Sequence, residues 1–232
     1  APNAEDRRSR PAALLNPLSE DLGVLPTSLI PMLLKSVADN EKNRPGSVRL
    51  FEVGKGQYPE PEKRTDRDPG FEETPLLCAT IAGHWRVNAL EEKPAQVSFA
   101  DLKGLIISLF KRLGLTVSLR TPAKPEVFLR PGPQGEIVCW NTVIGTAGIV
   151  RPAVLNKFEI SYETGIFEAD LNKVEKARKT QVTFKPFSRQ VFTTRDISME
   201  VDAKATHESI LEKINGFKAK NLVSVELKSI YQ

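Results

Sequence analysis

The sequence predicts an α+β fold in which helices pack on a mostly antiparallel sheet. Apolar residues between positions 29 and 37 recur at helical spacing, which is typical of a helix with one buried face. Residues 48–54 alternate in polarity with the period of a strand. Residues 135–150 form two strand-like runs around Asn141, as in a hairpin. Together these patterns favour a sheet of neighbouring antiparallel strands with helices covering it.

The segment 14–58 carries the clearest local signals. An apolar strand entry is expected at 12–15, followed by a helix in which Ser28 accepts hydrogen bonds from the free amides of the first turn. Residues 43–46 end this helix and lead into a strand in which Val48 is buried and Arg49 exposed. The predicted buried stripe of the helix consists of Leu29, Ile30, Leu33, Leu34 and Val37.

Further elements follow from caps, glycines and apolar runs. Residues 76–82 are expected to form a central strand. Ser98 begins an S-x-x-D pattern that is typical of a helix start, and Gly114 is expected to end this helix. Gly145 and Gly148 lie inside a predicted strand, which indicates close approach of a neighbouring backbone. The other expected elements are strands at 115–119 and 165–171 and a short helix that has Pro152 in its first turn.

Composition excludes several classes of protein. The 232 residues are 40% hydrophobic, enough for a sizeable core, and the net charge of +4 permits nucleic-acid contact without requiring it. Cys78 and Cys139 each lie in an apolar run, which favours a reducing, cytoplasmic compartment. No apolar segment approaches the roughly 20 residues that span a bilayer, so no membrane association is expected.

Charge and proline content suggest the domain limits. Residues 1–11 are expected to be a disordered tail, and the polar segment 55–74 a mobile connection. Residues 12–172 would form the main module and 173–186 a basic linker. The remaining 187–232 would supply a β-α-β unit, with strands at 191–201 and 222–231 around a helix that Thr206 caps.

Several motifs resemble the β subunit of bacterial phenylalanyl-tRNA synthetase. The chain contains L-L-N-P-L-S from Leu14, L-P-T-S-L-I-P from Leu25, L-F-E-V-G from Leu50, F-A-D-L-K-G from Phe99 and F-E-A-D-L from Phe167. Pro26 replaces a family arginine and Met32 a family glycine, while Arg130 and Arg151 replace histidines. The order and spacing of the motifs carry the resemblance.

The resemblance implies a class II synthetase-like sheet, followed by the first half of a ferredoxin-like anticodon-binding domain. Family members continue beyond the point at which this chain stops, so we expect a fragment that is cut at both ends. The whole enzyme would be a cytoplasmic α2β2 ligase that uses ATP and magnesium to attach phenylalanine to its tRNA. Its catalytic α subunit would be the partner of this chain, and the magnesium-binding carboxylates and editing site of the family lie outside this span.

We expect no catalytic, cofactor or metal residues in this chain. Zinc sites need closely spaced Cys and His, whereas His84 and His207 lie far apart in sequence from each other and from both cysteines. His207 is expected in a helix first turn, and His84 at a packed strand end rather than in a cleft. No glycine-rich phosphate loop is present. Class II enzymes clamp ATP with arginines, and Pro26 removes the one that most relatives keep.

RNA contact is the remaining candidate activity. Lys185, Arg189 and Arg195 are the predicted nucleic-acid-binding residues, because basic side chains near Phe184 and Phe187 suit phosphate neutralisation and base stacking. An ordinary solvated linker is the alternative interpretation of this segment. For the whole chain, the alternatives are a free-standing RNA-binding or adaptor protein on the same module, and a relic that still binds an amino acid or nucleotide.

Overall fold

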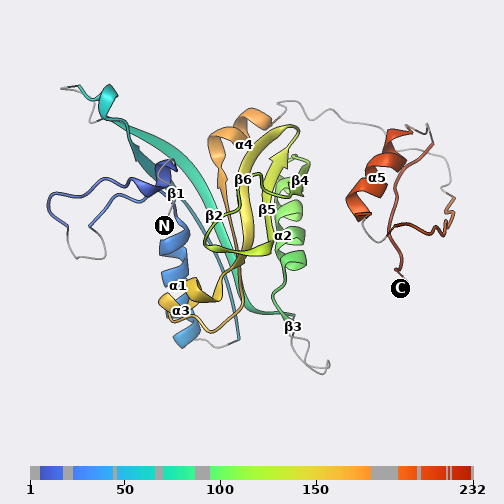
Figure 1. Cartoon of the computed structure of the whole chain (residues 1–232), viewed down its shortest axis with the longest axis horizontal. Coiled ribbons are helices and arrows are strands. Elements are labelled where there is room, and N and C mark those ends of the chain that lie inside the picture. The colour runs from blue at the N-terminus through green and yellow to red at the C-terminus, as the bar shows by residue number, and fades with distance from the viewer. Residues whose placement is uncertain are drawn as a thin grey trace. The chain divides into compact units, whose positions relative to one another are not determined.

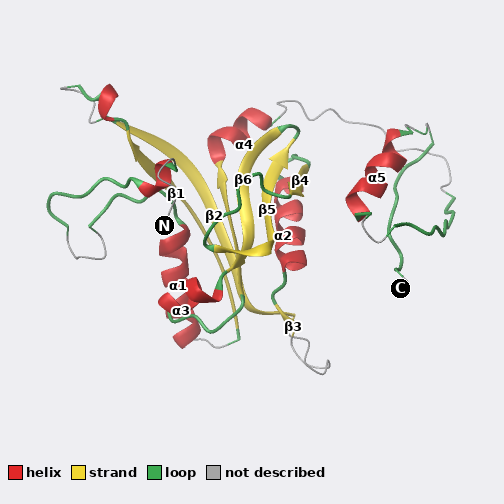
Figure 2. Cartoon of the chain, in the orientation of Figure 1, coloured by secondary structure: helices red, strands yellow, loops and turns green. Residues whose placement is uncertain are grey.

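The chain forms two compact units, Ala1–Thr183 and Phe184–Gln232, shown in Figure 1. The structure is a computed structural model that describes residues 6–17, 23–43, 46–65, 70–86, 95–178, 193–202, 205–217, 219 and 221–230. Figure 2 shows the strands and helices of the chain in the same view. The observed α+β architecture confirms the predicted fold class.

The first unit is built on a seven-stranded sheet in the order β1-β2-β7-β6-β5-β4, with β3 paired to β2. Every pairing between these strands is antiparallel, as the sequence predicts. The strands are β1 (Ser47–Pro59), β2 (Phe71–Arg86), β3 (Ala95–Gln96), β4 (Val117–Arg120), β5 (Leu129–Cys139), β6 (Thr142–Val150) and β7 (Thr164–Asp170).

Helices cover both faces of this sheet. The α1-side face packs against α1 (Ile30–Asn43) and α3 (Pro152–Lys157), and the α2-side face against α2 (Phe99–Arg112) and α4 (Leu171–Ala177). Each face has its own apolar core, and all five residues of the predicted α1 stripe are buried in the α1-side core. Within the described residues, no helix is long and apolar enough to cross a membrane.

The predicted caps and stops form as expected. Ser98 and Asp101 make a reciprocal capping box at the start of α2, and Gly114 takes a φ of +78° after its end. The Ser28 hydroxyl accepts a hydrogen bond from the Ile30 amide at 3.2 Å. Each of these signals depends on residues within a few positions of one another, which is why the sequence alone reveals them.

Gly145 and Gly148 are sites of close backbone approach, as predicted. A Cβ atom on Gly145 would lie 2.3 Å from the carbonyl oxygen of Glu168 on β7. One on Gly148 would lie 2.9 Å from the carbonyl oxygen of Pro133 on β5. Glycine at both positions therefore lets β6 lie tightly between its two neighbours.

The prediction that residues 55–74 form a mobile connection is wrong for most of this segment. The β1–β2 ladder continues as far as the pair Pro59–Phe71, and Tyr58 and Thr74 are buried. Figure 1 shows this hairpin extending beyond the neighbouring strands, with the 3-10 helix η3 (Pro61–Lys63) near its tip. Polar residues pair across the two strands, as Lys55 does with Glu73, so low apolar content does not here mean a loop.

Three other boundaries also differ from expectation. Residues 6–10 of the expected disordered tail contain the 3-10 helix η1 (Arg7–Ser9), which hydrogen bonds hold against the sheet. The start of the expected linker belongs to α4, because Val174 is buried in the α2-side core. The expected strand entry at 12–15 is reduced to one bridge, between Ala13 and Val24.

In the second unit, the described residues contain one helix, α5 (His207–Gly216), which Thr206 caps as predicted. The two expected strands do not form: residues 193–202 and 221–230 carry no strand pairing. Lys228 and Asp196 make an ion pair between these segments at 2.6 Å. Apolar side chains on both remain exposed, including Ile197 at 79% and Val223 at 71%, and a two-stranded element without burial is marginal in water.

Candidate functional site

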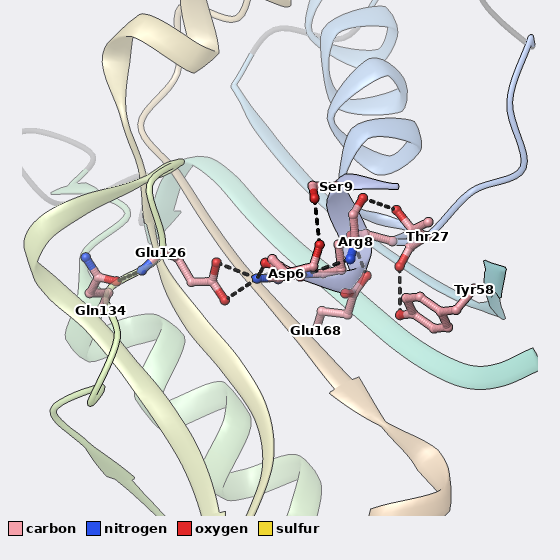
Figure 3. A network of polar contacts seen from close by, with 9 residues as sticks. Asp6, Arg8, Ser9, Thr27, Tyr58, Glu126, Gln134 and Glu168 are labelled. Carbon is pink, nitrogen blue, oxygen red and sulfur yellow. Dashed lines mark hydrogen bonds and ion pairs between the residues drawn. The ribbon is translucent and has the colours of Figure 1, made fainter. Parts of the chain in front are cut away.

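The strongest polar cluster of the first unit lies on the α1-side face, beyond the N-terminal end of α1. Residues 6–10, here called the strap, cross this region, as Figure 3 shows. The strap backbone is held by Thr27, whose hydroxyl donates to the Arg8 carbonyl at 2.9 Å. The carbonyl of Thr27 in turn accepts a hydrogen bond from the Tyr58 hydroxyl at 2.8 Å.

Arg8 is the centre of the cluster. Its Nε donates to both carboxylate oxygens of Asp6, at 3.1 and 3.0 Å, and its Nη2 donates to both oxygens of Glu126, at 2.9 and 2.8 Å. Burial disfavours the charged guanidinium, but the bonds to Asp6 and Glu126 outweigh it, so the pKa of Arg8 is raised above its ordinary value. The bond from Arg8 lowers the pKa of Asp6. Arg8 is therefore a charged side chain held between two carboxylate groups.

Glu168 is a buried carboxylate beside Arg8. Its Oε1 accepts hydrogen bonds from the Leu29 amide at 2.8 Å and the Ser28 hydroxyl at 2.9 Å, directly before α1. The residue is 8% exposed, and this burial raises its pKa although both hydrogen bonds act in the opposite direction. Glu168, on strand β7, therefore caps the N-terminal end of helix α1 and adds negative charge to the α1-side face.

Arg7 fastens the strap to the β1–β2 hairpin. Its guanidinium carbon lies 3.8 Å from the centre of the Tyr58 ring, and its Nη1 is 3.0 Å from Glu72. The bond from Arg7 lowers the pKa of Glu72, and burial raises that of Tyr58. The strap thus contacts the hairpin through Arg7 and the segment before β5 through Arg8.

The Arg8 guanidinium is not placed to bind a phosphate group. Burial raises the pKa of the Cys78 thiol, and the neighbouring charges of Glu168 and Glu52 raise it further. Arg8, the cation at its centre, is already bound to two carboxylates. Pro26, at the family arginine position, uses its carbonyl to accept a hydrogen bond from the Gln57 amide. The carboxylates around Arg8 suit a guanidinium, and their charge disfavours a phosphate at this point.

A hollow of about 510 Å³ opens near the start of α2. Its charged residues, Arg130 and Glu163, pair with each other at 2.8 Å, and its Ser98 caps α2. The charged groups of this hollow and the Ser98 hydroxyl therefore already have hydrogen-bonding partners within the chain. Across the described ranges, no group of three His, Cys, Asp or Glu residues could hold a metal ion. The cysteines Cys78 and Cys139 are buried free thiols.

The predicted RNA-binding residues are only partly placed. Lys185 and Arg189 lie outside the described residues. Arg195 is exposed, and its Nη1 donates to the Thr194 carbonyl at 3.1 Å. The assignment of these three residues to nucleic-acid binding stays a prediction.

Sequence reasoning missed Arg8, Glu126 and the role of Glu168. An acid inside the otherwise apolar run of β7 was a usable signal for Glu168, since a buried carboxylate needs partners. Arg8 and Glu126 are 118 positions apart, and neither lies in a recognisable motif. Only the folded sheet brings them together.

The motifs that carry the family resemblance have definite places in this geometry. In F-E-A-D-L, Phe167 is fully buried, Glu168 caps α1 and Asp170 caps α4 by accepting from the amides of Asn172 and Lys173. In L-F-E-V-G, a Cβ on Gly54 would lie 2.9 Å from the Leu29 side chain. These motifs therefore hold α1 and α4 on the sheet.

A family comparison decides the assignment of the chain. Residues 2–171 match the family described as the phenylalanyl tRNA synthetase beta chain CLM domain. The chain belongs to this family. The matched region contains the whole seven-stranded sheet and ends at the first residue of α4.

Curated relatives carry the same family name. The chain is 30% identical over 220 residues to "Phenylalanine--tRNA ligase beta subunit" of Listeria monocytogenes, which covers 95% of this chain and 27% of that protein. The protein of the same name from Dehalococcoides mccartyi is 30% identical over 221 residues, 95% of this chain and 26% of its own length. The protein of the same name from Carboxydothermus hydrogenoformans is 29% identical over 224 residues, which are 97% of this chain and 27% of that protein. The chain thus spans about a quarter of the length of these relatives.

Proposed function

We propose that this chain is the catalytic-like part of a phenylalanine–tRNA ligase β subunit, together with the beginning of a C-terminal tRNA-binding unit. In the whole enzyme it acts as a scaffold for the catalytic α subunit in an α2β2 assembly. That enzyme uses ATP and magnesium and works in the cytoplasm. The family match over residues 2–171 and the names of the relatives support this proposal.

One observation supports a role without catalysis. By the family resemblance, this antiparallel sheet would be the counterpart of the sheet that holds ATP in class II synthetases, and its α1-side face carries Glu126, Glu168 and an Arg8 already paired with carboxylates. Arginines bind phosphates through bidentate, charge-assisted bonds, and Arg8 makes such bonds to carboxylates instead. The chain therefore positions other parts of the enzyme rather than activating phenylalanine.

Exchange of pyrophosphate into ATP tests the absence of catalysis. The purified chain is expected to show no phenylalanine-dependent exchange above a buffer control, and an α subunit measured in parallel with an intact β subunit serves as the positive control. Co-purification of this chain with a tagged α subunit tests the scaffold role. Exchange by the chain alone, or failure to bind the α subunit, would contradict the corresponding part of the proposal.

Binding of tRNA is tested by fluorescence anisotropy at several salt concentrations. Substitution of Lys185, Arg189 and Arg195 by Gln should each lower the slope of log affinity against log salt by about 0.7, the value for one lost single-strand phosphate contact. Lys111→Gln, at the end of α2, removes the same charge outside this segment and is the matched control. Equal effects of all four substitutions would indicate bulk charge rather than a specific site.

The free-standing adaptor remains less favoured, because the matched relatives are ligase subunits and no observation points to another assembly. A relic that binds nucleotide is less favoured because Arg8 is already bound to the carboxylates of Asp6 and Glu126.

A further inference from the structure

We propose that the α1-side face contains a guanidinium-binding pocket whose ligand is the chain's own Arg8, and that the pocket accepts a guanidinium group from another molecule when the Arg8 side chain is withdrawn. The strap is then an internal ligand that keeps this face closed. The pocket is formed by the carboxylates of Asp6 and Glu126, with Glu168 beside them, as Figure 3 shows. This inference does not depend on the proposed ligase function.

The contacts match the shape of a guanidinium. Nε and Nη2 of Arg8 together make three bonds to the Asp6 carboxylate, and the same Nη2 reaches both oxygens of Glu126. The Arg8 side chain is 30% exposed and that of Glu126 only 14%. A planar fork with several fixed donors satisfies this arrangement, whereas an ammonium group presents a compact point charge.

Glu126 is positioned independently of Arg8. Its backbone amide donates to Gln134 Oε1 at 2.8 Å, and Gln134 Nε2 donates to the Arg130 carbonyl at 2.9 Å. Gln134 is itself 7% exposed, so it holds the segment before β5 firmly onto the sheet. The backbone that carries the Glu126 carboxylate therefore stays in place when the guanidinium is removed.

The strap backbone is also anchored without the Arg8 side chain. Thr27 holds the Arg8 carbonyl, which any residue at this position provides. Arg7 holds the strap to Tyr58 and Glu72. Truncation of Arg8 should thus leave an empty space lined by Asp6 and Glu126, rather than release the whole strap.

The charge of the face selects the ligand class. Asp6, Glu126 and Glu168 lie close to the Arg8 guanidinium, and Lys124 is the other cation that acts on Asp6, so without Arg8 three carboxylates face one cation. A guanidinium restores both the charge balance and the hydrogen bonds, an ammonium restores only the charge, and phosphate restores neither.

Chemical rescue of Arg8→Ala in the 232-residue chain tests this inference. Ethylguanidinium is expected to raise the melting temperature of the variant saturably, by about 3–6 °C at a concentration ten times its Kd. Ethylammonium and inorganic phosphate, each at the same ionic strength, are expected to give no saturable rise. The double variant Arg8→Ala/Glu126→Gln should lose the response to ethylguanidinium.

Two controls separate a pocket from a general solvent effect. The wild-type chain should not respond, because Arg8 fills the site. Arg120→Ala also removes an Arg–Glu pair, Arg120–Glu136, but at a position where the arginine side chain is 55% exposed, so it should not respond either. A folded Arg8→Ala variant without a saturable rise, or an equal rise in the wild type or in Arg120→Ala, would overturn the inference.

The test remains decisive if Arg8→Ala does not fold. Its refolding is then followed by circular dichroism in ethylguanidinium and, at matched ionic strength, in ethylammonium. Recovery of folded protein in ethylguanidinium alone supports the pocket, and equal recovery or none in both solutions overturns it.

Discussion

Gly145→Ala should destabilise the first unit strongly, because its new methyl group would meet backbone atoms. The added Cβ would lie 2.3 Å from the Glu168 carbonyl oxygen and 2.8 Å from the Ala169 Cα. Ordinary contact begins at 3.4 Å, so β6 and β7 would have to separate by 3.4 − 2.3 = 1.1 Å at this point. No side-chain rotation can relieve this contact.

The expected cost follows from the pairing that is lost. Separation by about 1 Å lengthens a ladder bond of about 2.9 Å beyond hydrogen-bonding range, and each lost bond costs about 1 kcal/mol. With one or two bonds lost and overpacking of about 1–3 kcal/mol, the free energy of unfolding should fall by about 2–5 kcal/mol. At about 3 kcal/mol the melting temperature of a unit of this size drops by about 6–12 °C.

Urea unfolding followed by circular dichroism measures this change, with Gly104→Ala as the matched control. Gly104 lies inside α2, and a Cβ there would meet nothing within 4 Å. This control should gain about 0.5–1 kcal/mol, since alanine favours the helix. If the two variants change stability by the same amount, or Gly145→Ala is neutral, the close approach of β6 and β7 does not limit the fold.

Three further predictions concern a charge, a cap and the second unit. The pKa of Glu168 is raised in the folded state, so the folded protein keeps this proton to a higher pH than the unfolded protein does. The free energy of unfolding of the wild type should therefore fall as the pH rises from about 4.5, the ordinary pKa of a glutamate, through the raised pKa. Glu168→Gln should remove that fall in pH-dependent urea titrations; an unchanged slope would assign it to another group. Ser98→Ala should lower the free energy of unfolding by about 1 kcal/mol through loss of the α2 cap, while the exposed Ser118→Ala on β4 should change it little. In hydrogen exchange, amides of residues 222–230 should be far less protected than those of 76–82 in β2, and equal protection would mean that the second unit is stable as it stands.

How far the sequence predicts this structure depends on the distance between interacting residues. The Ser98–Asp101 capping box, the Gly114 stop and the Pro152 helix start are complete within a few positions, so they could be predicted. The α1 stripe was predictable because burial repeats with the helical period.

The unpredicted features are long-range. Arg8 and Glu126 meet only because β5 lies in the same sheet as the β1–β2 hairpin, and nothing local marks either residue. Residues 55–59 and 71–74 were misinterpreted because their polar side chains pair across strands, as Lys55 pairs with Glu73. For 191–201 and 222–231, alternation predicted strands, yet the described parts of both segments lack pairing, since alternation does not itself supply apolar burial.

Strand β7 sets the alignment of two helices at once. Glu168 caps α1 and Asp170 caps α4, so the starts of helices that are far apart in sequence depend on two positions of one strand. A slip of β7 by one residue would bring Phe167 or Ala169 to the place of Glu168, and neither side chain can accept the Leu29 amide. An incorrect register is thus penalised at α1 as well as along the ladder. The acidic residues of β7 therefore help to select the correct strand register when the sheet assembles.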